Sequence, residues 1–117
     1  MPYVDGFVLA VHKVKVEDYR ALSQKAGEVW KEYGALAYVE CVADDVPYGE
    51  LTSFPRAVQA KDDELVVFSW IVYESREHRD AVNAKVMADP RLKHDPANVV
   101  FDGKRMIYGG FRTIVEL

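Results

Sequence analysis

The chain has 117 residues, half of them apolar, and its 15 basic and 19 acidic side chains give a net charge of −4. This length suits one hydrophobic core, so we expect residues 1–117 to form a single domain. The acidic balance repels a phosphate backbone, and we expect no nucleic-acid partner. Since no apolar run reaches the length of a membrane span, we also expect no membrane partner.

The cysteine content points to a reducing compartment. Cys41 is the single cysteine and cannot form an intramolecular disulfide, so we expect a cytoplasmic location. Its neighbours at alternate positions are small, and we interpret Cys41 as a small buried hydrophobe rather than a nucleophile. The basic residues of the last third are interpreted as an exposed loop face: Arg91, Lys93, His94, Lys104 and Arg105.

The first predicted element is a strand over Tyr3–Val11. Its odd positions carry bulky residues, whereas its even positions carry only small ones. A helix is predicted over Val16–Tyr33, because apolar residues recur at spacings of three and four and form one stripe that packs on the core: Tyr19, Leu22, Ala26, Val29 or Trp30, and Tyr33. Gly34 is expected to end this helix in the left-handed conformation.

A second strand is predicted over residues 35–46, and a third over Leu65–Tyr73. The connection over residues 46–63 is long for a small domain, and such segments are often functional. Its aromatic and apolar residues indicate a loop packed by its own side chains. We hold two interpretations of this loop open: a lid over a site, or an arm that crosses a partner subunit.

The last third is predicted to contain one helix and one strand. Ser75 is a suitable N-cap for a helix over Arg76–Ala88, which Asp89-Pro90 ends. Asp102-Gly103 predicts a two-residue turn between an extended segment at 99–101 and a strand over Met106–Val115.

The order β-α-β-β-α-β predicts the α+β ferredoxin-like fold, an antiparallel four-stranded sheet with both helices on one face. We place the smaller residues of each strand under the helices. The uncovered face then holds Tyr3, Phe7, Leu9, Tyr38, Val42, Phe68, Trp70, Val72, Met106 and Tyr108. Because monomers rarely expose an apolar patch of this size, we predict a homodimer with the two sheets face to face.

Two carboxylates, Asp5 and Glu40, fall on the bulky face among aromatic residues. A carboxylate there loses solvation and suits acid–base catalysis when a tyrosine hydroxyl stabilises the developing oxyanion. We therefore select Asp5 and Glu40 as candidate catalytic residues. The candidate ligand-binding residues are Tyr3, Phe7, Tyr38, Phe68, Trp70 and Tyr108. The alternative is that both carboxylates pair with basic side chains or tyrosines and only fix the register of a dimer.

No pair of histidine, cysteine or acidic residues has the spacing of metal ligands, so we predict no metal and no other cofactor.

Several segments resemble a known family. They are Tyr3–Phe7, Gly34–Cys41, Thr52–Pro55, Ser69–Tyr73, Asn83–Pro90 and Phe101–Phe111. Together they closely resemble the YbaA-like family of small bacterial proteins, catalogued as domain of unknown function family 1428, over essentially the whole chain. The resemblance implies a dimeric α+β barrel, with no established activity and no catalytic residues.

The wider superfamily that this fold resembles includes monooxygenases, haem-degrading enzymes, isomerases, lyases and ligand sensors. Haem-degrading members have a polar residue on the first strand, a tryptophan on the third and a histidine on the second helix. Asp5, Trp70 and His78 lie on comparable elements here. However, Asp5 is a carboxylate rather than an amide and His78 comes about one turn early, so we expect no haem.

Two classes of function stay open. One is a small-molecule-binding or acid–base enzyme-like protein with a pocket on the sheet. The other is a non-catalytic homodimeric module whose aromatic face only buries an interface. A closed cavity of about 300 Å3 or more bordered by Asp5 or Glu40 favours the first class, and interdigitated side chains without space favour the second.

Overall fold

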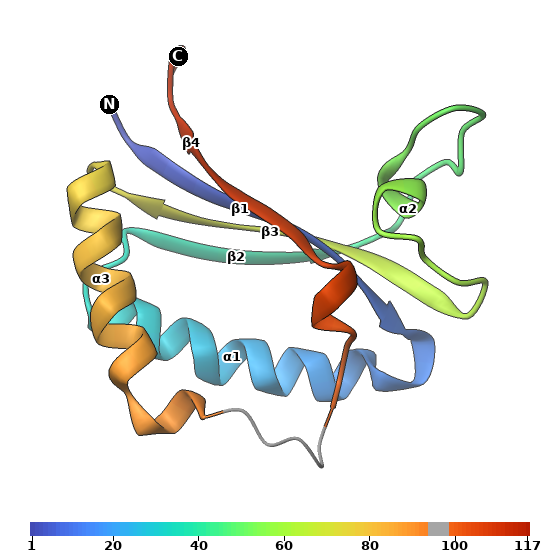
Figure 1. The fold of residues 1–117 in the computed structure, drawn as a ribbon, viewed down its shortest axis with the longest axis horizontal. Coiled ribbons are helices and arrows are strands. Elements are labelled where there is room, and N and C mark those ends of the chain that lie inside the picture. The colour runs from blue at the N-terminus through green and yellow to red at the C-terminus, as the bar shows by residue number, and fades with distance from the viewer. Residues whose placement is uncertain (94–98) are drawn as a thin grey trace.

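The chain folds, in a computed structural model that describes residues 1–93 and 99–117, into an antiparallel four-stranded sheet with two long helices against one face (Figure 1). The elements are β1 (Tyr3–His12), α1 (Val16–Glu32), β2 (Ala37–Val42), α2 (Phe54–Ala57), β3 (Glu64–Tyr73), α3 (Arg76–Ala88) and β4 (Ile107–Arg112). The sheet order is β2-β3-β1-β4. This arrangement confirms the predicted ferredoxin-like fold.

The two long helices begin and end at the residues that the sequence indicates. After α1, Gly34 adopts a φ of 113°, and the amides of Gly34 and Ala35 donate to the carbonyls of Lys31 and Trp30 at 3.1 and 3.0 Å. At the start of α3, the Ser75 hydroxyl accepts from the amide of His78 at 3.1 Å. These local caps explain why both helices were predicted to within one residue.

The predicted assignment of the two sheet faces was wrong. Asp5 lies opposite Ile71 and Phe7 opposite Ser69, so the bulky residues of β1 share a face with the odd-numbered residues of β3. That face lies beneath α1 and α3, where Ile71 and Tyr73 pack with residues of both helices. The bulky side chains of the strands fill the layer between the sheet and the helices, because the side chains of two helices do not fill that layer alone.

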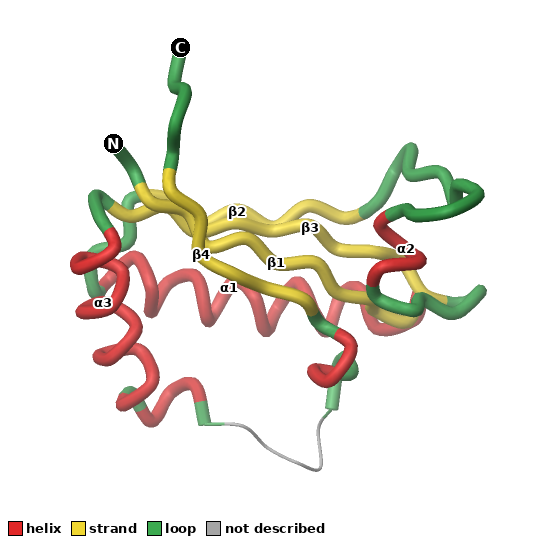
Figure 2. Tube along the Cα trace, turned by 45° about the horizontal axis from the view of Figure 1, so that its top comes forward, coloured by secondary structure: helices red, strands yellow, loops and turns green. Residues whose placement is uncertain are grey.

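The other side of the sheet is apolar except at one end, where His12 lies opposite Glu64. We call its apolar part the open face, which by register consists of Val4, Gly6, Val8, Ala10, Ala37, Val39, Cys41, Val66, Phe68, Trp70, Val72, Ile107, Gly109 and Phe111. Val58, which follows α2, is buried against Val8, Ala10 and Val66 at one end. Figure 2 shows that neither long helix lies over this face.

The long connection between β2 and β3 is not packed by its apolar side chains as predicted, since Tyr48, Leu51 and Phe54 are 59 %, 88 % and 49 % exposed. Polar contacts hold it instead. Ser53 caps α2 by accepting from the amide of Arg56 at 3.1 Å. The Arg56 guanidinium lies 4.0 Å from the ring centroid of Tyr48 and donates to the carbonyls of Tyr48 and Gly49 at 3.0 Å each. Its function as a lid or an arm stays a prediction.

The predicted two-residue turn at Asp102-Gly103 was wrong. Asp102 instead caps a 3-10 turn over Gly103–Arg105, and Phe101 forms a single bridge with Val11 of β1. Both sides of this turn therefore follow the edge of β1. Arg105 fixes this path because its guanidinium binds both carboxylate oxygens of Glu64 at 2.8 Å.

Candidate functional site

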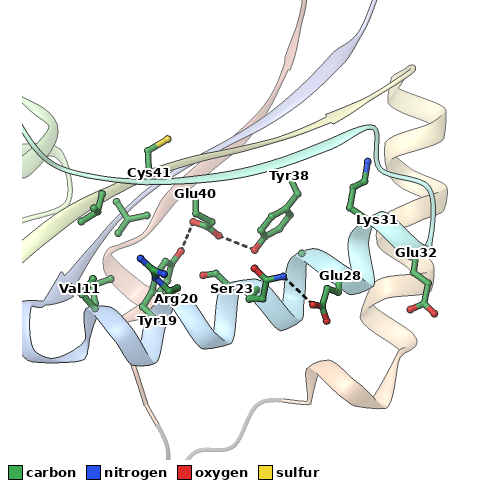
Figure 3. A pocket seen from close by; sticks show the side chains of 15 residues that line it. Val11, Tyr19, Arg20, Ser23, Glu28, Lys31, Glu32, Tyr38, Glu40 and Cys41 are labelled. Atoms are coloured by element: carbon green, nitrogen blue, oxygen red, sulfur yellow. Dashed lines mark hydrogen bonds between the residues drawn. The ribbon is translucent and has the colours of Figure 1, made fainter.

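The cleft between α1 and β2 holds the carboxylate of Glu40 between two tyrosines (Figure 3). The Tyr19 hydroxyl donates to Glu40 Oε1 at 2.8 Å, and the Tyr38 hydroxyl donates to Oε2 at 2.9 Å. Tyr38 and Glu40 lie two residues apart on β2, so both side chains face α1. Each oxygen of this carboxylate thus has one phenolic donor.

The helix side of this site consists of Tyr19, Ser23 and Gly27, which are buried and spaced four residues apart. The predicted apolar stripe included Leu22, whose side chain is in fact 43 % exposed. α1 is therefore rotated so that small residues face β2. At Gly27 the Tyr38 ring lies directly against the helix, since a Cβ there would be 2.6 Å from Tyr38 Cδ1.

The two tyrosines of the site are held as hydrogen-bond donors. Burial, followed by the negative charge of Glu40, raises the pKa of both Tyr19 and Tyr38 well above the ordinary value of 10. Both phenols therefore stay protonated over the physiological pH range. It follows that a proton accepted by Glu40 must come from a bound molecule or from water.

Two hollows meet at this carboxylate. The outer cleft, of about 780 Å3, runs along α1, and the inner cavity, of about 300 Å3, lies between the sheet and the helices. Tyr19, Ser23, Tyr38 and Glu40 line both hollows. The inner cavity has a largely apolar wall of Phe7, Leu9, Trp30, Ile71, Val86, Met87, Leu92, Phe101 and Met106. Glu40 is therefore accessible from both sides.

The second candidate carboxylate, Asp5, lies in a different environment under α3. It is 5 % exposed, and the Arg79 guanidinium donates to its Oδ1 at 3.1 Å. Arg79 also donates to the Tyr3 hydroxyl at 3.2 Å. Burial raises the pKa of Asp5, and the positive charge of Arg79 opposes this rise. Asp5 is thus held in a buried ion pair.

The structure does not bring the two candidate catalytic residues together. Asp5 belongs to β1 and Glu40 to the edge strand β2, with β3 between them, which separates the strands by roughly 10 Å. Asp5 is not among the described residues that line the outer cleft or the inner cavity.

The six candidate ligand-binding residues divide between the two faces of the sheet. Tyr3, Phe7, Tyr38 and Tyr108 share the helix face with the carboxylates. Phe68 and Trp70 lie on the open face, which corrects the prediction that all six surround one pocket. Residue size suggested that grouping, but the antiparallel register pairs Trp70 with Gly6 and Phe68 with Val8. Of the four on the helix face, Phe7 and Tyr38 line the inner cavity.

Two other sequence interpretations concern Cys41 and the basic residues of the last third. Cys41 is exposed on the open face, so its assignment as a buried hydrophobe was wrong. Arg91 pairs with Glu32 and Asp89, and Arg105 with Glu64 and Asp102, while His94 lies outside the described residues.

The comparison with haem-degrading enzymes fails on geometry. Trp70 and Asp5 lie on opposite faces of the sheet. His78 Nδ1 accepts from the amide of Glu74 at 3.0 Å, and its ring packs edge-on against Tyr73 with centroids 6.0 Å apart. The three residues therefore do not form one site.

Sequence reasoning missed the helix side of the site and the partner of Asp5. Tyr19 and Trp30 were assigned to core packing, and Ser23 and Arg79 were not considered. The available signal was the spacing of four between Tyr19, Ser23 and Gly27 on α1. The two small residues, Ser23 and Gly27, permit close approach of a strand.

Within residues 1–93 and 99–117, no group of three or more histidine, cysteine or acidic side chains is placed to hold a metal ion. No helix in this part of the chain is both long and apolar enough to cross a membrane.

Fold and site together define an α+β protein of the ferredoxin-like type with a polar group in a cavity between sheet and helices. Residues 2–103 match the family described as protein of unknown function (DUF1428), and the chain belongs to this family. It is 55 % identical over 116 residues to the uncharacterized protein YbaA of Escherichia coli strain K12, with 99 % of each chain covered. The Shigella flexneri YbaA protein has the same identity and coverage.

A solved structure supports the fold. An uncharacterized NIPSNAP domain protein from Burkholderia xenovorans superposes with a TM-score of 0.52 at 16 % identity, covering 95 % of this chain and 93 % of the other. At this identity the likeness concerns the fold alone.

Proposed function

We propose that the protein binds a small molecule in the inner cavity and that Glu40 is the acid–base group that contacts it. The observation that carries this proposal is a cavity of about 300 Å3 bordered by Glu40. This volume lies at the lower end of the range for small-molecule pockets, which are mostly apolar with few polar groups. The cavity reaches the volume that we expect of a ligand site and is bordered by Glu40, but it is partly open rather than closed.

Two phenols prepare Glu40 for this role. Tyr19 and Tyr38 hold the carboxylate in one orientation, so the Glu40 side chain loses less conformational entropy when a ligand binds. Each carboxylate oxygen has more than one acceptor position, so both can still accept from a ligand. Asp5, by contrast, is buried under α3 and accepts from Arg79 through Oδ1. We therefore assign Asp5 to the stability of the fold and Glu40 to function.

A ligand screen tests this proposal. Native mass spectrometry of protein purified from its own host reports any retained ligand, and a thermal-shift screen of small metabolites finds added ones. Glu40→Gln should weaken the binding of any ligand that is found. Glu28→Gln, an exposed position in the outer cleft, is the matched control and should retain it. Ligands that bind equally to wild type and Glu40→Gln would refute the site.

We also propose a homodimer formed through the open face, in keeping with the resemblance to a dimeric α+β barrel. The fourteen members of this face are uncharged, and the ionisable residues of the same side, His12 and Glu64, lie at one end of the sheet. Phe68, Ile107 and Phe111 of the open face are 43 %, 45 % and 64 % exposed. Contiguous apolar patches on single subunits usually mark interfaces. A non-catalytic dimeric module remains the second candidate function, and this face is the observation that favours it.

A cytoplasmic location completes the proposal, since the exposed thiol of Cys41 stays reduced in that compartment.

A further inference from the structure

The wall of the inner cavity carries one kind of charge. Among its described lining residues Glu40 is the only carboxylate, and none is lysine, arginine or histidine. The other polar side chains of these residues are the hydroxyls of Ser23 and Ser69, the phenols of Tyr19 and Tyr38, and the indoles of Trp30 and Trp70. A molecule that fills this cavity therefore meets one negative charge in an apolar surround.

Glu40 has no salt bridge with any described residue. The two basic residues that line the outer cleft have other partners. Arg20 pairs with Glu17 at 3.6 Å, and Lys31 Nζ donates to the carbonyl of Leu36 at 2.9 Å. A half-buried carboxylate that lacks a counter-ion is costly, and a cation in the cavity removes that cost.

The aromatic residues of the cavity point to the same kind of ligand. Six aromatic residues line it: Phe7, Tyr19, Trp30, Tyr38, Trp70 and Phe101. The Trp30 and Tyr38 rings are adjacent, with centroids 6.0 Å apart. A cation within about 6 Å of such a ring is attracted to its face, and the attraction grows when water is excluded. The apolar side chains accommodate the body of the ligand.

We propose that the ligand of the inner cavity is a compact organic monocation, a protonated amine with an apolar body, whose ammonium group binds Glu40. This inference rests on the proposed function and specifies its ligand class. An anion meets repulsion from Glu40. A second charge on the ligand finds no partner in the described wall, and a cavity of about 300 Å3 excludes a large ligand.

Three probes of similar size distinguish a site for cations from one for neutral molecules or anions: phenethylammonium, 2-phenylethanol and 3-phenylpropionate. Titration of isotope-labelled protein, followed by the amide resonances of β2 and α1, measures their dissociation constants. The cation should bind at least about tenfold more tightly than the neutral alcohol, and the anion should be weakest. Glu40→Gln should lower the affinity for the cation to that for the alcohol. Glu28→Gln, which removes an equal charge from the outer cleft, should leave the preference unchanged.

Some results would overturn the inference and leave the proposed function in place. If the alcohol or the anion binds as tightly as the cation, and Glu40→Gln abolishes that binding, the site is real but does not select cations. If no probe binds at about 1 mM, the cation class is wrong. Should Glu40→Gln fail to fold, Glu40→Asp retains the charge but withdraws it from the cavity. It should weaken binding of the cation alone, and an unchanged cation preference would contradict the inference.

Discussion

The ring of Tyr38 lies so close to Gly27 of α1 that a methyl group on Gly27 would be 2.6 Å from Tyr38 Cδ1 and 2.8 Å from Cε1. Only the absence of a side chain at Gly27 allows β2 to place the Tyr38 hydroxyl against Glu40. A glycine in the middle of a helix costs about 1 kcal/mol relative to alanine. The close approach of strand and helix at the site offsets that cost.

Gly27→Ala should therefore destabilise the protein despite its gain in helix propensity. Overpacking of a filled site costs about 1–3 kcal/mol, and displacement of the Tyr38 ring breaks its bond to Glu40. Urea denaturation measures the free energy of unfolding. In a Tyr38→Ala background the same change should be neutral or stabilising, because the ring is gone. A loss of stability in both backgrounds would contradict the proposed contact.

The ion pair under α3 leads to a second prediction. Arg79→Met leaves Asp5 buried without its counter-ion and should cost about 3 kcal/mol of unfolding free energy at pH 7. Burial already raises the pKa of Asp5, and loss of Arg79 raises it further. An ionised Asp5 then penalises the folded state above that pKa, so the deficit should shrink as the pH is lowered.

Urea denaturation at pH 7 and pH 5 tests this dependence. Arg76→Met is the matched control, since Arg76 lies on the same helix, is exposed and approaches Asp80 only to 4.0 Å. It should change the free energy of unfolding by less than about 1 kcal/mol at either pH. A deficit in Arg79→Met that is independent of pH would show that lost packing, rather than the charge of Asp5, is the cause.

The comparison between sequence and structure shows which signals are local. Ser75 and Gly34 fix the ends of helices through contacts within four residues, so the helices were predictable. The face occupied by Phe68 and Trp70 depends on which residue of β1 lies opposite each of them. Register is a property of two strands, and alternation within one strand does not determine it.

The candidate site was predictable only in part for the same reason. Glu40 and Tyr38 lie on one strand, and alternation placed them on a common face. Tyr19 comes from a helix, and its contact with Glu40 depends on the rotation of α1 about its axis. The predicted stripe included the buried Tyr19 and Val29 but missed Ser23 and Gly27, because the close approach at Gly27 favours small residues against the strand.

A third prediction concerns acid unfolding. Arg105 holds the pKa of Glu64 at about 2, below its ordinary value of 4.5. The stabilisation from this pair is therefore complete above pH 4.5 and is lost as the pH falls from 4.5 towards 2. Glu64→Gln should lower the free energy of unfolding at pH 7. It should also reduce the slope of that free energy against pH in this window, by the amount that corresponds to at most about one proton taken up on unfolding.

The exposed Glu50 provides the control for this measurement, because it lies in the connection before α2 and removal of its carboxylate changes the net charge equally. Glu50→Gln should leave the acid limb of the stability profile unchanged. If both variants flatten the profile to the same extent, general charge repulsion rather than the Glu64–Arg105 pair determines the acid sensitivity.

The last prediction concerns the assembly through the open face. Sedimentation velocity of the wild-type protein should show a dimer, and Phe68→Glu should shift it to monomer while the far-ultraviolet circular dichroism stays unchanged. Phe68 is 43 % exposed at the centre of the face, so a new charge there is solvated in the monomer but desolvated in the dimer. Leu51→Glu adds the same charge at a residue that is 88 % exposed outside the face, and it should remain dimeric. A wild-type monomer at high micromolar concentration would instead leave the open face available to a different partner.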